Sequence, residues 1–219
     1  MCSIIGSFSK EKVKELAALN AYRGQHSHSI TVFKTPWYDV VYQHKGFGPL
    51  IVDDHDFDTE DTYIVAHQQA PTTENKDEDS IHPAIIGNNM LWHNGIIKEK
   101  SIKEMQKRLN STLTWDTKLM LTQLMLLDNI DSIDGTFSCL WRNNDKLYVF
   151  RNEISPLFVD NELNISSTKF NSSNSLEPNV IYNIHTGVSQ LLKEKKICVG
   201  ELNPVSTFKT VENPYYFGE

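Results

Sequence analysis

The sequence lacks both a long apolar run and an excess of basic residues, and these absences narrow the functions to consider. No stretch approaches the roughly 20 apolar residues of a membrane-spanning helix. The start of the chain also lacks the basic flank and long apolar stretch of a secretory signal. The formal net charge is −7, and the 21 Lys and Arg residues are scattered, which argues against a nucleic-acid-binding surface. We therefore expect no membrane and no nucleic acid as partners.

Cysteine is scarce, with Cys2, Cys139 and Cys198 as the three examples. An odd count at wide spacing indicates neither a disulfide framework nor a zinc site, and we expect no metal and no cofactor. Thiols of this kind fit a reducing compartment, so we expect a cytoplasmic location. Cys139 and Cys198 lie in apolar segments and are typical of small buried hydrophobic residues.

What the chain does have is an ordinary globular composition, with 219 residues, 39% hydrophobic and 22% charged. It shows no internal repeat and no linker, so we expect one domain over residues 1–219. Strand patterns dominate both ends, and helical patterns lie between them. This order predicts an α+β domain in which sheets are covered by helices.

Helical periodicity predicts three helices, at Lys10–Ala21 with Ser9 as its cap, Ser101–Leu109 and Trp115–Leu127. A strand is expected at Ser3–Phe8. Gly46–Pro49 is expected to end the strand at Tyr38–Tyr42. The other expected strands are Ile30–Phe33, Tyr38–Tyr42, Tyr63–His67, Asn89–His93, Phe137–Trp141, Leu147–Arg151, Leu157–Val159, Asn164–Ser167, Val180–Ile184 and Val188–Leu192.

Two acidic segments, Asp53–Asp61 and Glu74–Asp79, flank the strand expected at Tyr63–His67. Their spacing has a superficial likeness to calcium ligands. They lack the glycine and the terminal glutamate of a calcium-binding loop. We interpret both as solvated loops.

The second residue, Cys2, is the feature that bears most directly on chemistry. If Met1 is removed, Cys2 carries a thiol and a free α-amine, whose ordinary pKa is about 7.7–8.0. Such an amine can accept a proton near neutral pH, and a nucleophile activated by its own terminal amine is a known route to covalent catalysis. The alternative is that Cys2 merely fills the start of a buried strand.

Four segments, read in order, resemble class II glutamine amidotransferases of the N-terminal-nucleophile hydrolase group. Met1–Gly6 is similar to the processed Cys-Gly-Ile start of that family, and Tyr22–Ser27 to its Arg-Gly-x-Asp-Ser segment. Ala66–Thr72, with His82-Pro83 downstream, resembles Ala-His-x-Arg-Trp-Ala-Thr followed by His-Pro. His93–Ile97 matches the family's His-Asn-Gly-Ile-Ile. Weaker similarities, which extend the resemblance over most of residues 2–170, lie at Lys45–Gly48, Trp115–Thr117, Asp134–Ser138 and Arg151–Leu157.

The resemblance implies a four-layer αββα sandwich and hydrolysis of the side-chain amide of glutamine. It implies that Cys2 is the nucleophile and that the Asn94 side chain and the Gly95 backbone N–H form the oxyanion hole. The alternative for Asn94-Gly95 is an ordinary hairpin turn. His67 and His93 are interpreted as core or supporting residues, because the terminal amine already supplies the base.

The same resemblance assigns substrate-binding roles. Asp116 matches the aspartate that binds the α-ammonium of glutamine, and its alternative is an acid interacting with a helix dipole. Arg23 resembles an arginine that supports the nucleophile, and its alternative is a surface arginine. Thr72 matches a threonine near the substrate carboxylate. Gln69 departs from the pattern, because the family has there an arginine that grips the carboxylate.

Three functions remain open on the sequence. The first is a glutaminase or amidotransferase that releases ammonia for a separate synthase, since only about fifty residues follow residue 170. The second is a hydrolase of a different amide, which the Gln69 substitution suggests. The third is a catalytically retired fold that acts as a binding subunit.

Overall fold

The computed structural model describes residues 2–70, 78–127, 130–186, 190–192, 195–197 and 200–211. Four earlier predictions fall wholly or partly outside these residues. They are the roles of Thr72 and Cys198, the first part of the acidic segment Glu74–Asp79, and the start of the strand predicted at Val188–Leu192.

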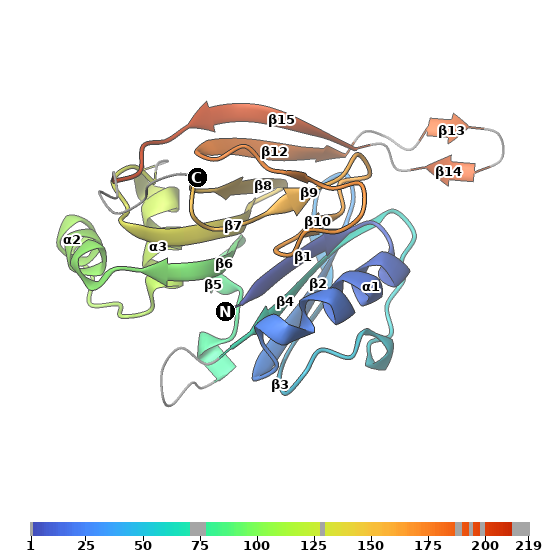
Figure 1. Ribbon diagram of the computed structural model, residues 1–219, viewed down its shortest axis with the longest axis horizontal. Helices are drawn as coiled ribbons and strands as arrows, with labels where there is room; N and C mark the ends of the chain where they lie inside the picture. The colour runs from blue at the N-terminus through green and yellow to red at the C-terminus, as the bar shows by residue number, and fades with distance from the viewer. Residues whose placement is uncertain are drawn as a thin grey trace.

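Two antiparallel sheets face each other, and helices cover their outer faces (Figure 1). The first sheet has the strand order β11-β9-β10-β1-β4-β2-β3, and the second has β15-β12-β8-β7-β6-β5. The first sheet consists of β1 (Ser3–Ser7), β2 (Ser27–Lys34), β3 (Asp39–Phe47), β4 (Thr62–Gln69), β9 (Phe158–Val159), β10 (Ile165–Ser166) and β11 (Asn174–Ser175). The second consists of β5 (Ala84–Ile86), β6 (Asn89–Ile97), β7 (Gly135–Asn143), β8 (Lys146–Arg151), β12 (Val180–Thr186) and β15 (Gly200–Thr207).

Helix α1 (Lys10–Asn20) covers the first sheet, while α2 (Glu99–Leu109) and α3 (Asp116–Leu127) cover the second (Figure 1). Short 3₁₀ turns are η1 (Ala21–Arg23), η2 (Val52–Asp54) and η3 (Glu78–Ser80), and β13 (Gln190–Leu192) pairs with β14 (Lys195–Ile197). Within the described part of the chain, every helix falls short of the length and apolar character needed to cross a membrane.

Three apolar layers separate the four layers of backbone, and β1 shows how they arise. Successive side chains of a strand point to opposite faces. Ile5 therefore packs with Leu16 under α1, while Ile4 packs with Trp92 between the two sheets. A third layer joins the second sheet to α2 and α3, with Leu119 and Phe137 among its members. The predicted αββα sandwich is confirmed.

The local predictions were best where a pattern was long and capped. Helix α1 begins after Ser9, whose hydroxyl accepts a hydrogen bond from the Lys12 N–H at 3.2 Å. Two predicted strand ends were wrong. β3 continues through Gly46, which pairs with His28, and β6 continues through Asn94, which pairs with Ser138. The edge strands β5 and β15 were not predicted. The strand predicted at Val188–Leu192 lies partly outside the described residues, which here resume with β13.

Candidate active site

Cys2 lies directly before β1, near the middle of the first sheet. Cys2 is buried, with 6% of its surface exposed. The Arg23 guanidinium is also buried, and its Nε–H donates to the Cys2 carbonyl oxygen at 2.9 Å. The interpretation of Arg23 as a surface residue is therefore wrong. The 3₁₀ turn η1 directs this side chain back to the start of the chain.

Asn94 lies on β6 of the facing sheet, and a serine connects it to β1. The Asn94 Nδ2 donates to the Ser167 hydroxyl at 3.2 Å, and that hydroxyl also accepts from the Ile4 N–H at 2.9 Å. The Ser167 N–H in turn donates to the Ile4 carbonyl at 3.1 Å. The Asn94 carbonyl accepts from the Ser155 hydroxyl at 3.0 Å. Asn94 is thus fixed on both sides, and Ser167 connects it to Ile4, two residues along the chain from Cys2.

Gly95 has a backbone conformation and surroundings that exclude any other residue. Its φ is +153°, and a Cβ there would lie 1.8 Å from the Thr136 carbonyl oxygen and 2.9 Å from the His93 Nε2. Gly95 pairs with Phe137 inside the ladder of β6 and β7. The hairpin-turn alternative for Asn94-Gly95 is therefore wrong, because both residues are internal to a strand.

Gln69 ends β4 and is fully buried. Ser3 pairs with Gln68, so one further step of the antiparallel register sets Cys2 opposite Gln69. The Gln68 Nε2 donates to the Ala17 carbonyl of α1. Because side chains alternate along a strand, Gln69 and Cys2 face the second sheet.

The loop after η1 also lies close to the end of β4, at Gln69. A Cβ at Gly24 would lie 2.4 Å from the Ala70 nitrogen, so a larger residue would push this loop away. The His26 N–H donates to the Gln69 carbonyl at 3.0 Å. The segment that carries Arg23 is therefore held against the end of β4.

The Gln69 amide bonds to protein groups on both of its ends. Its Oε1 accepts from the His82 Nδ1 at 3.0 Å, and its Nε2 lies 3.4 Å from the Ser80 carbonyl. With Nδ1 as the donor, the His82 Nε2 is an acceptor, and it meets the Thr117 hydroxyl at 3.0 Å. Gln69, His82 and Thr117 form a buried side-chain relay where the family resemblance implies a carboxylate-binding arginine.

Asp116 stands at the far end of this relay. Its Oδ1 accepts from the Thr117 N–H at 2.7 Å, as an acid at a helix N-terminus does. Its Oδ2 lies 3.8 Å from the His93 Nδ1, and that same nitrogen lies 3.2 Å from the Thr117 hydroxyl. About a quarter of the Asp116 side chain is exposed, at 24%. The carboxylate can thus accept a hydrogen bond from the first turn of α3 and also bind a cation that enters from solvent.

His67 and His93 are supporting residues in the geometry. His67 is fully buried, and its Nε2 lies 3.3 Å from the His93 carbonyl, which joins β4 to β6. The His93 Nε2 lies 3.3 Å from the Thr136 carbonyl. Both rings are occupied by fixed contacts between strands.

Lys45, which begins the weakly similar segment Lys45–Gly48, is a charged group beside the relay to which the sequence assigned no role. Its Nζ donates to the carbonyls of Ile81 and Pro83, which flank His82, at 2.7 and 2.8 Å. Burial lowers the pKa of Lys45 to about 8, with a smaller opposing contribution from Asp79 and a smaller lowering one from Lys118.

Two groups of residues result, and we name them for use below. The nucleophile group is Cys2, Arg23, Asn94 and Gly95. The relay group is Gln69, His82, Asp116 and Thr117. Sequence reasoning missed the roles of three residues, Ser167, Ser155 and Thr117. Their contacts join residues far apart in the chain, and no local sequence pattern indicates such contacts. Thr72 lies outside the described residues.

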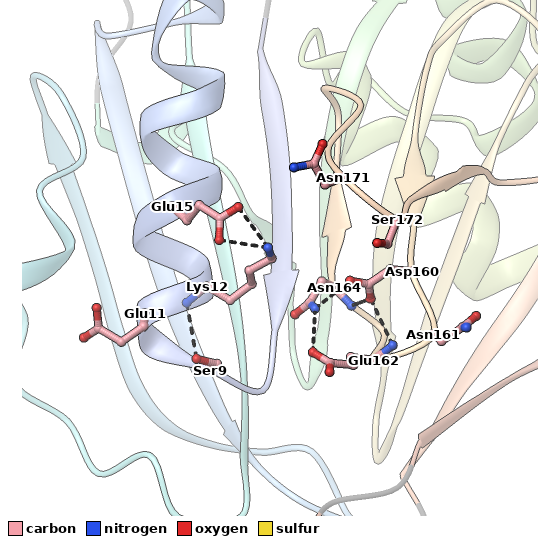
Figure 2. Close-up of a pocket in the computed structure, with 10 residues that line it drawn as sticks. All are labelled: Ser9, Glu11, Lys12, Glu15, Asp160, Asn161, Glu162, Asn164, Asn171 and Ser172. Atoms are coloured by element: carbon pink, nitrogen blue, oxygen red, sulfur yellow. Dashed lines mark hydrogen bonds and ion pairs between the residues drawn. The ribbon is translucent and has the colours of Figure 1, made fainter.

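The hollow drawn in Figure 2 is a separate feature of the molecule. Glu11 and Glu15 of α1 lie on one side of it, and Asp160 and Glu162 on the other (Figure 2). Ser9, which also lines it, follows the end of β1, whereas Cys2 precedes the start of that strand. Five strand residues, about 17 Å, separate the two positions.

Comparison with known proteins shows likeness in structure alone. No family model and no curated protein matches the sequence. A glutamine phosphoribosylpyrophosphate amidotransferase from B. subtilis, complexed with ADP and GMP, is similar with a TM-score of 0.63 and 14% identity. The match covers 84% of this chain and 47% of that one.

A structure described as the allosteric regulatory enzyme of purine biosynthesis is similar with a TM-score of 0.60 and 13% identity. That match covers 92% of this chain and 49% of the other, so this chain spans about half the length of both proteins. The protein therefore shares the fold of these two enzymes, which confirms the resemblance to class II glutamine amidotransferases at the level of the fold.

Proposed function

We propose that this protein is an amide hydrolase that uses Cys2 as an N-terminal nucleophile on the side-chain amide of glutamine. The observation that supports this most strongly is that Ser167 connects Asn94, on one sheet, to β1 of the facing sheet, the strand that begins directly after Cys2. The Ser167 hydroxyl lies within 3.2 Å of the Asn94 Nδ2 and 2.9 Å of the Ile4 nitrogen. A nucleophile and an oxyanion donor need such a fixed separation.

The first chemical step is attack of the Cys2 sulfur on the amide carbon. Removal of Met1 frees the Cys2 amine, which accepts the thiol proton directly or through a water. The hydrogen bond from Arg23 to the Cys2 carbonyl holds the backbone that carries both groups. The nucleophile and its base thereby keep one orientation.

The tetrahedral oxyanion is stabilised by Asn94 and Gly95. An asparagine amide has two N–H donors, and the Asn94 Nδ2 uses one on Ser167, which leaves a second for the oxyanion. The Gly95 backbone N–H is the partner donor in this proposal. Such preorganised donors cost no reorganisation during the reaction.

Collapse of the intermediate breaks the C–N bond. The protonated amine returns its proton to the departing nitrogen, so ammonia leaves and a thioester remains on Cys2. Water then hydrolyses the thioester to a carboxylic acid and restores the thiol. A separate synthase that accepts the ammonia is part of this proposal.

Substrate orientation falls to the relay group. Asp116 is partly exposed and negatively charged, which suits the α-ammonium of glutamine. Gln69 carries no charge, and its amide is engaged by His82 and Ser80. This engagement supports a second candidate, in which the substrate is an amide without an α-carboxylate.

The decisive experiment measures ammonia release from glutamine by wild type and by Cys2→Ala. We expect the variant to lose at least about 10⁴-fold in kcat, because the covalent step is removed. Intact mass reports whether Met1 is absent, and a glutamine-like diazoketone should label Cys2. Asparagine and simple primary amides are run in parallel to separate the two candidates.

Each other outcome has a definite meaning. Ammonia release unchanged in Cys2→Ala, or a mature protein that retains Met1, would refute the mechanism. Turnover of simple amides but not of glutamine would favour the second candidate. Absence of both turnover and labelling in protein that lacks Met1 would favour a retired fold acting as a binding subunit.

A further inference from the structure

Three histidines gather on the outer face of the first sheet, on the side of α1. His28 lies on β2, His44 lies on β3, and His55 follows η2. One ring nitrogen from each lies within 4.8 Å of the others. The ring centroids are 5.6 Å apart for His28 and His44, 5.9 Å for His28 and His55, and 4.8 Å for His44 and His55.

The register of β2 and β3 brings the first two histidines together over a glycine. His28 pairs with Gly46, and Ile30 pairs with His44, so the two histidines are diagonal neighbours on one face. A Cβ at Gly46 would lie 3.0 Å from the His44 Nε2 and 3.3 Å from the His28 Nε2. Both Nε2 atoms therefore point into the space above Gly46.

The other nitrogens of the two buried rings are already bonded. The His28 Nδ1 lies 3.1 Å from the Gly48 carbonyl, and a carbonyl can only accept. The Nδ1 therefore carries the proton, and the His28 Nε2 presents a lone pair. The His55 Nδ1 lies 2.9 Å from the Tyr42 hydroxyl. Metal-binding histidines almost always have such a partner on the second nitrogen.

The two buried rings, His28 and His55, differ from the exposed ring of His44 in their surroundings. Burial lowers the pKa of His28 and, with the other two histidines adding to the effect, that of His55. His44 is exposed, so the space is open to solvent on one side. The Lys10 ammonium is nearby but donates to the His55 carbonyl, and the Asp54 carboxylate gives partial compensation.

We propose that His28, His44 and His55 bind a divalent late transition metal ion, with Zn²⁺ as the reference ligand. Imidazole ligands suit zinc, copper and nickel, whereas calcium and magnesium prefer oxygen. Zn–N bonds of about 2.0–2.1 Å in tetrahedral geometry require nitrogens about 3.3–3.4 Å apart. Rotation of the exposed His44 side chain brings its nitrogen inward. Water completes the coordination.

This site is independent of the proposed amide chemistry. His28 pairs with Gln68, whose side chain bonds to α1, so the histidines lie on the opposite face of the sheet from Cys2. The cysteine count gave no hint of it, because the three ligands come from separate segments and contain no thiol. Metal binding is measured without any turnover, so the two proposals fail separately.

The test is a zinc titration of tag-free, full-length protein in competition with a chromogenic chelator. Wild type should bind one Zn²⁺, and His44→Ala should weaken binding at least about 100-fold. Gly46→Ala, which puts a methyl group between the nitrogens, should weaken binding while it keeps all three ligands. His26→Ala is the matched control, because it removes a histidine of the same sheet edge that lies outside the cluster.

Co²⁺ substitution then identifies the ligands. The Co²⁺ spectrum of wild type should show d–d bands without a thiolate-to-metal charge-transfer band, and Cys2→Ala should give the same spectrum. The proposal is overturned if wild type binds no Zn²⁺, if folded His44→Ala binds it equally well, or if the charge-transfer band is present. Circular dichroism establishes that each variant is folded.

Discussion

The nucleophile group and the relay group are held in different ways. In the first, the bonds involve the backbone: Arg23 donates to the Cys2 carbonyl, and Ser167 bonds both polar backbone atoms of Ile4. In the second, side chains bond mainly to one another, as with His82 between Gln69 and Thr117. Backbone contacts therefore fix the nucleophile group, whereas a relay of side chains is open to change by substitution. We infer that the first group determines the reaction and the second the substrate.

Among the substitutions that test this difference between the two groups, Asn94→Ala should have the largest effect on activity. Loss of an oxyanion donor should lower kcat by about 100- to 1000-fold and leave KM nearly unchanged. Asn94→Asp keeps the shape but has no N–H donor, so it should lose a similar amount. Steady-state kinetics of ammonia release measure both values. A large rise in KM at normal kcat would place Asn94 among the groups that bind ground-state substrate.

Gly95→Ala tests whether register supports the nucleophile group. The new Cβ would collide with the Thr136 carbonyl, so we expect a loss of about 1–3 kcal/mol in the free energy of unfolding. Gly87→Ala is the control, because Gly87 also has a positive φ, at +57°, but has no atom within 4 Å of the added Cβ. Urea unfolding compares them. Equal losses in both variants would assign the effect to backbone strain alone.

Gln69→Leu tests the relay group. It removes the acceptor for His82, so the free energy of unfolding should fall by about 1 kcal/mol. KM should change more than kcat, since the reacting groups keep their backbone contacts. The exposed Gln25, changed to Leu, is the control. A fall in kcat at constant KM would show that the two groups do not divide the work as described.

The last prediction concerns Lys45 and the pH dependence of stability. Its folded pKa of about 8 lies below the unfolded value of 10.5, so the unfolded chain binds more protons between these values. Stability from this group should therefore rise as pH increases from about 8 to 10.5. Lys45→Met should lack this rise. Urea midpoints of wild type and variant across that range measure it, and parallel curves would contradict the prediction.

The sequence predicted the parts of the fold that rest on local patterns. Helix α1 follows from its spacing and from Ser9, and β4 follows from a strand-forming segment that is buried along its whole length. Asn94-Gly95 was ambiguous, because Asn-Gly is also typical of tight turns and only pairing with β7 resolves it. The family resemblance supplied the layer order.

The contacts that build the site were beyond sequence reasoning. Asn94 and Ser167 are 73 residues apart, and His82 and Thr117 are 35 apart. The histidine cluster depends on the register of β2 and β3, which a single strand pattern does not specify. Long-range pairing decides such contacts, and no local signal accompanies them.

The contact of Ser167 with Ile4 has a consequence for the order in which the molecule is made. Ser167 is added to the growing chain about 165 residues after Cys2. At about 5–20 residues per second, that interval is about ten to thirty seconds. During this time the nascent chain carries Cys2 and Ile4 but not the serine that bonds both Ile4 and Asn94. The hydrogen-bonded connection between β1 and Asn94 therefore forms only after Ser167 has been synthesised.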